Sequence, residues 1–352
     1  MDQLVRRILS DQSGEGLLSF TSLTCLVVLI LSIVISSKVF FCGRDRFNPE
    51  SKHCYIGGGS QGLGLALACL LAEAGSDVTI VSRSQEKLND ALRKINTFRK
   101  SPGQKFLALS YDLSSFESSQ EAFDRACIPF DGRCPDYVFC CTGGAAGILG
   151  YFIQLSPDQL RRSIEVNLLT AVWTTRIAAR KMAKQGVKGR LVLTSSILGF
   201  FGLPGYSAYT TSKHALRGLA ESLRLEMILY DIKVHCYFPA TILSPGFDEE
   251  QKCKPELTKE IEGVDEGQSP EKCAKKLIRG LKNDQFLITS DPIGDLIRNS
   301  MTGITPISSM LYDPFLSFIG KIGLPIWRRI VERQIKGHSK RHKEEVIDSI
   351  KD

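Results

Sequence analysis

Tyr209 and Lys213 have the residue types and the spacing of a proton-transfer pair. The Ala and Leu content of residues 207–230 predicts a helix, so the two side chains, four residues apart, project from one face. A phenol titrates near ~10, and a cation beside it stabilises the phenolate nearer neutrality. Ser196, at the end of a predicted strand, can hydrogen-bond the oxygen that Tyr209 protonates. The alternative is a half-buried tyrosine beside a solvated lysine, and the spacing alone favours this alternative.

A glycine-rich turn lies between an apolar run and a helical stretch. Residues 53–56 predict a short strand and residues 65–72 a helix, with three spaced glycines between them. This spacing tightens the turn and lets a dinucleotide pyrophosphate approach the backbone amides at the helix N-terminus. Glycine-rich loops are common, but between a strand and a helix the turn predicts a dinucleotide site. The cofactor-binding residues expected here are Gly58, Ser60, Gln61, Gly62 and Gly64.

The second predicted strand, residues 77–82, ends beside a cation. A cofactor with a free ribose 2'-hydroxyl calls for Asp or Glu at this point, whereas a ribose 2'-phosphate calls for a positive charge. Ser82 and Arg83 stand there, so the sequence predicts NADP(H) with Arg83 as a cofactor-binding residue. The alternative is an exposed loop arginine without a ligand.

The order of apolar runs indicates the fold class. Seven short apolar runs alternate with helical stretches, which predicts an α/β fold with a doubly wound parallel sheet, the Rossmann fold. The chain has 352 residues, 43% of them hydrophobic and 24% charged, and one long α/β domain with membrane appendages fits it better than two domains. The predicted strands are residues 53–56, 77–82, 105–110, 137–141, 189–195, 233–238 and 285–289.

These features together resemble the short-chain dehydrogenase/reductase family over residues 51–290. The resemblance implies that Tyr209 is the general acid in carbonyl reduction and that Ser196 orients and polarises the carbonyl. It implies that Lys213 lowers the tyrosine pKa and holds the nicotinamide ribose. Asn167 matches the family's structural and proton-relay asparagine. We therefore expect these four residues to be catalytic, and Tyr209 and Lys213 also to contact the cofactor.

Two further segments match the family's cofactor site. Asp112-Leu113, which follow the third predicted strand, match the pair that contacts adenine. Residues 239–244 match the segment that lines the nicotinamide, with Ala240 where glycine is usual. Ile242 and Ser244 from this segment complete the expected cofactor contacts.

One family motif is altered. The Asn-Asn-Ala-Gly that follows the fourth strand in the family is here Cys-Cys-Thr-Gly, at residues 140–143. The glycine is kept and both asparagines are lost. The change removes the usual hydrogen bonds that steady the central strand and leaves the catalytic residues in place.

A closer resemblance is to the 3-ketodihydrosphingosine reductases. It implies reduction of the ketone of 3-ketodihydrosphingosine to dihydrosphingosine with NADPH, in sphingolipid biosynthesis, at the cytosolic face of the endoplasmic reticulum. A membrane-bound steroid or retinoid reductase of the same family is the alternative substrate class. A non-catalytic NADPH-binding scaffold is disfavoured because it has no use for the Ser/Tyr pair. The segments that carry the closer resemblance are 57–64, 80–84, 140–144, 244–247, 254–259 and 261–263.

The loop of residues 239–269 is expected to form a substrate lid, because it is long and follows a strand end on the cofactor side. Three successive carboxylates in it, Asp248, Glu249 and Glu250, either pair with the ammonium group of the substrate or are solvated. Their place in a loop favours solvation.

The N-terminal region, residues 1–50, predicts a membrane anchor. Gly16–Ser37 is 22 residues without a charge, roughly 33 Å as a helix and enough to span a bilayer. No small-residue cleavage site follows, so we expect an uncleaved transmembrane helix. More basic residues follow this segment than precede it, which favours a catalytic domain facing the cytosol. The 11 cysteines contain no CxxC pair, as expected for free thiols in a reducing compartment.

The C-terminal region, residues 291–352, is expected to associate with the membrane. Residues 301–327 are largely apolar but carry Asp313, Lys321 and prolines, which favours a re-entrant or interfacial segment over a simple spanning helix. Residues 328–343 hold seven Lys/Arg against one Glu, so a local +6 accounts for most of the chain's net +7. This run is either a solvated tail or a surface held against anionic lipid headgroups.

The expected partners follow from these features. They are a long-chain lipid ketone and the membrane, and a homo-oligomer is compatible with the sequence. Nucleic acid is not expected, because the basic run lacks interleaved aromatic residues. A metal site is not expected, because the five histidines show no ligand spacing.

Overall fold

The computed structural model describes residues 47–263, 266–301, 303 and 306–345. The predicted membrane anchor, Gly16–Ser37, lies outside the described residues. Within the described part, no helix combines the length and the apolar run needed to cross a bilayer.

One sheet of seven parallel strands forms the centre of the fold, in the order β3-β2-β1-β4-β5-β6-β7. Each apolar run predicted as a strand corresponds to one of these strands, so the predicted doubly wound α/β fold is confirmed. The strands are β1 (His53–Gly57), β2 (Asp77–Ser82), β3 (Phe106–Ser110), β4 (Tyr137–Cys140), β5 (Arg190–Thr194), β6 (Lys233–Phe238) and β7 (Leu287–Thr289).

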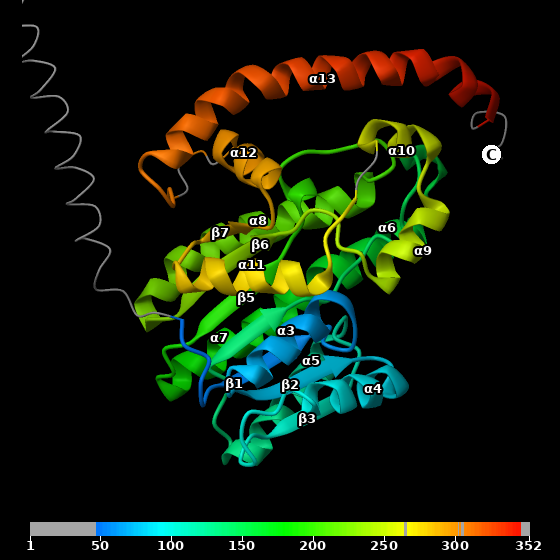
Figure 1. Cartoon of the computed structure of the whole chain (residues 1–352). Helices are drawn as coiled ribbons and strands as arrows, with labels where there is room; N and C mark the ends of the chain where they lie inside the picture. The colour runs from blue at the N-terminus through cyan, green and yellow to red at the C-terminus, as the bar shows by residue number, and fades with distance from the viewer. Residues whose placement is uncertain (1–46, 264–265, 302, 304–305, 346–352) are drawn as a thin grey trace, which may run out of the picture. The chain divides into compact units, whose positions relative to one another are not determined.

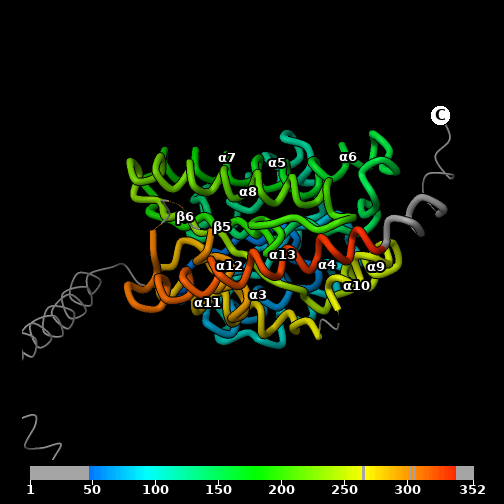
Figure 2. Tube along the Cα trace, turned by 90° about the horizontal axis from the view of Figure 1, so that it is seen from above, coloured from blue at the N-terminus to red at the C-terminus, as the bar shows by residue number. Residues whose placement is uncertain are grey.

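Helices cover both faces of the sheet (Figures 1 and 2). Because side chains alternate along a strand, Cys54 and Ile56 of β1 pack against one helical layer and Tyr55 against the other. The first layer contains α3 (Gly62–Glu73), α4 (Gln85–Asn96) and α11 (Pro270–Lys282). The second contains α5 (Phe116–Cys127), α7 (Thr170–Gln185) and α8 (Ser207–Glu226). Both hydrophobic cores therefore rest on the same central strands.

The order in which successive strands are added to the sheet reverses between β1 and β4. The strands β2 and β3 lie to one side of β1, whereas β4 to β7 follow on the other side. Loops at the carboxyl ends of two such strands diverge and leave a crevice, the usual ligand site of a doubly wound sheet. Here the glycine turn after β1 and residues 141–144 after β4 line that crevice.

Serine side chains cap two of the helices. Ser156 and Gln159 form a capping box at the start of α6 (Pro157–Ile164), and Ser269 accepts a hydrogen bond at the start of α11. Proline occupies the first position of both helices, where it has no hydrogen bond to lose.

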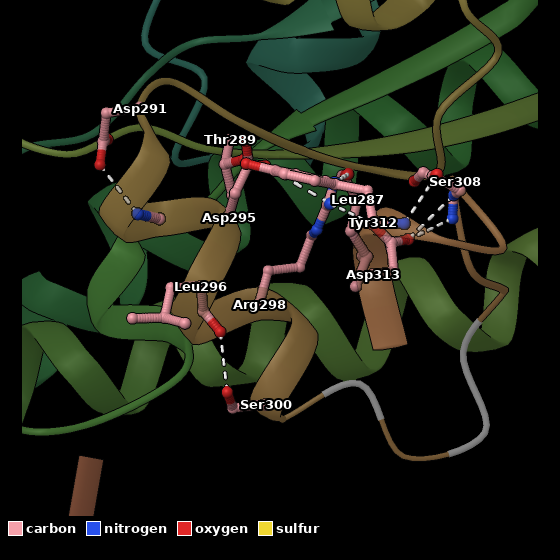
Figure 3. Close-up of polar contacts among 12 residues, drawn as sticks. Leu287, Thr289, Asp291, Asp295, Leu296, Arg298, Ser300, Ser308, Tyr312 and Asp313 are labelled. Carbon is pink, nitrogen blue, oxygen red and sulfur yellow. Dashed lines mark hydrogen bonds and ion pairs between the residues drawn. The ribbon is translucent and has the colours of Figure 1, made fainter. Parts of the chain in front are cut away.

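A buried ion pair fastens the C-terminal helix to the domain (Figure 3). Arg298 of α12 (Pro292–Ser300) donates to the carbonyl of Leu287 at 3.0 Å and to Asp313 Oδ1 at 3.2 Å, at the start of α13 (Tyr312–Glu345). The other oxygen of Asp313 accepts from the backbone N–H groups of Ser308 and Ser309. Both buried charges are thus hydrogen-bonded, as their burial requires.

The region predicted as a re-entrant or interfacial segment continues into one long helix. The helix α13 has 34 residues and runs through Pro325, while Pro314 lies in its first turn, where a missing N–H is tolerated. Both views show α13 running from α12 toward α9 (Pro245–Cys253) and α10 (Glu256–Glu262) (Figures 1 and 2). This continuity excludes a re-entrant hairpin within α13.

Candidate active site

A cleft of about 1750 Å³ opens at the carboxyl ends of the strands. This volume exceeds the roughly 300–1,000 Å³ of a single small-ligand pocket, so it can hold a dinucleotide and an elongated second ligand. The glycine turn lines one part of it, and residues of α9, α10 and α13 line another. Leu324, Trp327 and Val331 of α13 belong to this lining, and Trp327 meets Phe201 edge-on with ring centroids 5.6 Å apart.

Close backbone approach requires two glycines of the turn. Gly58 has a φ of +81°, and a Cβ on it would lie 2.7 Å from the backbone nitrogen of Thr142. A Cβ on Gly64 would lie 2.2 Å from the carbonyl oxygen of Gly58. The turn thus folds back onto the start of α3 and lies against the segment after β4.

The start of α3 and its surroundings fit a nicotinamide dinucleotide. The N-cap residue Gln61 makes no side-chain cap and the first turn has no acidic residue, so its N–H groups can bind an anion such as the pyrophosphate. Ser82 also lines the cleft, and its hydroxyl oxygen is buried without a hydrogen-bond partner. This orphaned group lies where the adenosine ribose of a dinucleotide would be held.

Two cations, rather than one, border this part of the cleft. Arg83 lines the cleft and is exposed there, and Lys87 in the first turn of α4 also lines the cleft. Lys87 Nζ donates to Gln61 Oε1 at 3.2 Å, which holds the lysine beside the glycine turn. The sequence analysis missed Lys87, although its position four residues after Arg83 was a usable signal.

The remaining predicted cofactor residues also line the cleft. Asp112 accepts a hydrogen bond from the backbone of Ser114 at 3.0 Å. Ser244 caps α9, and a Cβ on Gly62 would lie 3.4 Å from Ser244 Cβ, so the glycine turn packs against the segment after β6. The predicted cofactor residues that line the cleft are Gly58, Ser60, Gln61, Gly62, Gly64, Arg83, Asp112, Leu113, Tyr209, Lys213, Ile242 and Ser244.

The structure brings Ser196, Tyr209 and Lys213 together at the cleft. Ser196 follows β5, and its side chain is near enough to Tyr209 in α8 to lower the pKa of the tyrosine. Lys213 lies one helical turn later, with Nζ 5.4 Å from the centroid of the Tyr209 ring and 3.1 Å from the carbonyl oxygen of Thr194, to which it donates. Ser195 Oγ donates to the carbonyl of Lys213 at 2.8 Å and ties α8 to the end of β5.

Burial controls the ionisation of the tyrosine and the lysine. It raises the pKa of Tyr209, Glu250 raises it further, and the nearby Ser196 side chain opposes the rise. Burial lowers the pKa of Lys213 to about 8. Burial and Glu250 set the direction of this shift, and the lowering of the tyrosine pKa by Lys213 stays a prediction. Tyr209 therefore carries its proton at neutral pH, as a general acid must.

Asn167 lies behind the cleft rather than in its lining. It is fully buried within the π-helical turn Glu165–Leu169, and its amide clamps Gly144 by accepting from the backbone N–H at 2.8 Å and donating to the carbonyl at 3.0 Å. A Cβ on Gly143 would lie 2.7 Å from Asn167 Oδ1 and 3.2 Å from Lys213 Nζ. Asn167 thus positions the segment after β4 beside Lys213.

Other groups hold the altered Cys-Cys segment. The backbone N–H of Cys141 donates to the carbonyl of Gly57 at 2.8 Å. Cys140 Sγ lies 3.5 Å from Thr175 Oγ1, and Thr194 donates to Cys141 Sγ at 3.7 Å. The end of β4 is therefore tied to both neighbouring strands without the family's asparagines.

A cluster of charged residues near α9 and α10 was not predicted from the sequence. The hydroxyl of Tyr206 donates to Glu250 Oε1 at 2.5 Å, and Lys254 bridges Glu250 and Glu262. Of the three successive carboxylates in the predicted lid, Glu250 alone lines the cleft, and its neighbours are exposed. Tyr206 and Glu250 are 44 residues apart, so no local pattern could have linked them.

Comparisons with known proteins agree with this arrangement. The sequence pattern of short chain dehydrogenases matches residues 52–254. The chain is 34% identical over 316 residues to a 3-ketodihydrosphingosine reductase of Cryptococcus neoformans, covering 88% of this chain and 93% of that protein. It is 33% identical over 285 residues to a 3-dehydrosphinganine reductase of Danio rerio, covering 81% and 82% of the two chains.

A solved structure supports the fold independently. Levodione reductase superposes with a TM-score of 0.62 at 23% identity, covering 70% of this chain and 97% of its own. At this identity the likeness concerns the fold alone.

Proposed function

Because this chain belongs to the short-chain dehydrogenase family and, within it, to the 3-ketodihydrosphingosine reductases, we propose that it reduces the ketone of 3-ketodihydrosphingosine to give dihydrosphingosine, with NADPH as the reductant. The observation that carries the proposal is the meeting of Ser196, Tyr209 and Lys213 in one cleft with the glycine turn.

Ser196 and Tyr209 act on the ketone oxygen in different ways. Ser196 donates a hydrogen bond that orients the oxygen, and Tyr209 donates the proton that converts it to a hydroxyl. When bound, the reduced nicotinamide supplies the hydride to the ketone carbon. Lys213 stabilises the phenolate that Tyr209 becomes, and its Nζ is already placed by the carbonyl of Thr194.

The preference for NADPH is supported by the two cations at the adenosine end of the cleft. Arg83 can bind a 2'-phosphate through two parallel hydrogen bonds, and Lys87 adds a second positive charge. Asp112, a carboxylate of the lining, already accepts a backbone hydrogen bond. A ribose 2'-hydroxyl would gain little from two cations.

The apolar lining beyond Tyr209 supports a long-chain lipid substrate. Phe201, Leu203, Phe247, Ile261 and Leu324 come from four different segments, and all of them line the cleft. Burying an alkyl chain against such a surface contributes about 0.8 kcal/mol per CH₂ group. The cleft therefore has the volume and the surface that an amphipathic ketone needs.

We also propose that the protein is attached to the endoplasmic reticulum membrane, with its catalytic domain on the cytosolic side. The predicted anchor and its flanking charges support this orientation. A second contact is supported by α13, where exposed apolar side chains lie near exposed basic ones. The apolar side chains are Phe315, Phe318, Ile322, Ile326 and Ile330, and the basic ones are Lys321, Arg328, Arg329, Arg333 and Lys336.

The reaction is tested with the detergent-purified full chain, NADPH and 3-ketodihydrosphingosine. We expect NADPH consumption and dihydrosphingosine identified by mass spectrometry. Reduction of a steroid or retinoid ketone without reduction of the sphingoid ketone would replace the substrate. Tight NADPH binding with no ketone reduced would favour the scaffold alternative.

The membrane proposal is tested by fractionation. A variant without residues 1–45 should still sediment with membranes and should be released by alkaline carbonate with high salt. A fully soluble truncated protein would refute the contact through α13. Protease protection of the catalytic domain in intact microsomes would overturn the cytosolic orientation.

A further inference from the structure

Lys254 is a buried cation held between two carboxylates of the cleft. Its side chain is 3% exposed, and Nζ lies 3.3 Å from Glu250 Oε1 and 2.7 Å from Glu262 Oε2. The hydroxyl of Tyr206 donates to the same Glu250 oxygen at 2.5 Å. The lysine also lies over the rings of Tyr206 and Phe247, at 5.6 and 5.5 Å from their centroids. These contacts fix both carboxylates relative to the helix α8 that carries Tyr209.

The cluster carries one unbalanced negative charge. Two carboxylates face one ammonium, which leaves a net charge of −1, and Glu250 and Glu262 are only 19% and 21% exposed. The contacts with Lys254 are made by Oε1 of Glu250 and Oε2 of Glu262, and both residues line the cleft. Partly buried net charge is unfavourable unless a counter-charge completes it.

Other charges nearby do not supply that counter-charge. Arg328 of α13 pairs with Glu332 at 3.2 Å, and both side chains are largely exposed. Among the residues that the structure describes, Lys254 is the one cation that forms an ion pair with Glu250 or Glu262.

The cluster adjoins the catalytic tyrosine. The rings of Tyr206 and Tyr209 are 5.9 Å apart, and the hydroxyl of Tyr206 leads directly to Glu250. Glu250 also contributes to the raised pKa of Tyr209, which is an independent sign that its charge reaches the catalytic hydroxyl. A cation bound by Glu250 would therefore lie near Tyr209.

We propose that Glu250, assisted by Glu262, binds the ammonium group of an amino-ketone substrate and so places the neighbouring ketone against Tyr209. The inference rests on the proposed function, because the substrate named there carries its amine on the carbon next to the ketone. Binding adds the missing positive charge, so that two carboxylates face two ammonium groups. Lys254 and Tyr206 are positioning residues, since they act by holding Glu250.

This arrangement makes the amine a determinant of specificity. If the substrate's ammonium group pairs the partly buried carboxylates, an analogue without that group leaves them unpaired. The resulting loss of binding free energy is larger than the loss caused by one missing methylene in an apolar pocket. We therefore expect the protein to discriminate between 3-ketodihydrosphingosine and the same ketone without the amino group.

The test compares two ketones and two matched variants. Glu250→Gln keeps the shape and the acceptor oxygen but removes the charge, whereas Glu249→Gln changes a neighbour in the same helix that is 59% exposed and pairs with Lys252. The measured quantity is the ratio of kcat/KM for 3-ketodihydrosphingosine to kcat/KM for 1-hydroxyoctadecan-3-one. We expect Glu250→Gln to lower this ratio at least ~10-fold, mostly through KM, the cost of one charge-assisted contact. Glu249→Gln should leave the ratio unchanged.

Glu262→Gln provides a second variant, and we expect it to lower the same ratio by a smaller factor. Thermal unfolding and NADPH binding of each variant report whether it is folded. If the wild-type protein reduces both ketones equally well and Glu250→Gln leaves the ratio unchanged, the ammonium site is refuted while the reductase function stands. If the wild-type protein reduces neither ketone, the proposed function itself fails.

Discussion

Two tyrosine–lysine pairs lie side by side in the cleft and differ in what surrounds their lysines. Lys213 is 5.4 Å from the ring centroid of Tyr209, Lys254 is 5.6 Å from that of Tyr206, and both lysines are buried. Lys254 contacts two carboxylates. Lys213 instead donates to a backbone carbonyl, and it has no carboxylate partner in the described part of the chain.

This difference indicates a structural role for Tyr206 and Lys254 and a chemical role for Tyr209 and Lys213. Burial raises the pKa of Tyr206, and its carboxylate partners raise it further, so its hydroxyl stays protonated as a fixed donor to Glu250. The pKa of Tyr209 is also raised by burial, but the nearby Ser196 side chain opposes the rise. The buried charge of Lys213, which has a backbone carbonyl as its partner, is costly in the free protein, and burial lowers its pKa to about 8.

The largest effect is expected from removing the paired lysine. Lys254→Met leaves two partly buried carboxylates facing each other, which should destabilise the protein by about 3 kcal/mol, a value discounted for their partial exposure. The matched control is Lys252→Met, whose pair with Glu249 is exposed and should contribute less than about 1 kcal/mol. Thermal unfolding of both variants checks this, and equal midpoints would mean that the buried pairs contribute nothing.

The two tyrosines should differ in turnover. Tyr209→Phe should lower kcat at least ~100-fold with NADPH binding nearly intact, because a positioned general acid is lost. Tyr206→Phe removes a hydroxyl that contacts Glu250 and should act mainly on KM for the amino ketone. Steady-state kinetics with both variants decide the matter, and retained turnover in Tyr209→Phe would exclude it as the acid.

The unpaired lysine should make stability depend on pH. The pKa of Lys213 falls from 10.5 to about 8 on folding, so the free-energy penalty is full below pH 8, shrinks as the pH rises and is absent above 10.5. Lys213→Met removes the penalty and should be more stable than the wild type at pH 7 by roughly 2 kcal/mol. This advantage should shrink toward pH 10. Denaturant unfolding at several pH values measures it, and an advantage that grew with pH would reverse the assignment.

The smallest effect is expected at the exposed cation of the cofactor end. Arg83→Asp should lower the ratio of kcat/KM for NADPH to that for NADH by about 10-fold, the contribution of one charge-assisted contact. Lys87→Met should lower it less, since Lys87 is already engaged by Gln61. An unchanged ratio in both variants would mean that neither cation binds the 2'-phosphate.

Local sequence patterns predicted the fold and much of the candidate site. The seven strands, the glycine turn and the Tyr209–Lys213 spacing could be predicted because strand alternation, turn chemistry and the helical repeat act over a few residues. Within residues 301–327, the sequence could not show that one continuous helix begins at Tyr312 or that Arg298 of α12 pairs with Asp313. A polar residue in an apolar run looks costly until its partner is known.

The amino-acid sequence by itself determined the parallel sheet, the dinucleotide turn and the Ser196, Tyr209 and Lys213 set. Only the tertiary structure decided that Glu250 faces the cleft while its neighbours face solvent, and that α13 lines the same cleft. The physical reason is the range of the interactions. Helix and turn preferences are read within one or two turns of chain, whereas the burial of a charge and its partners depend on which distant segments the fold brings into contact.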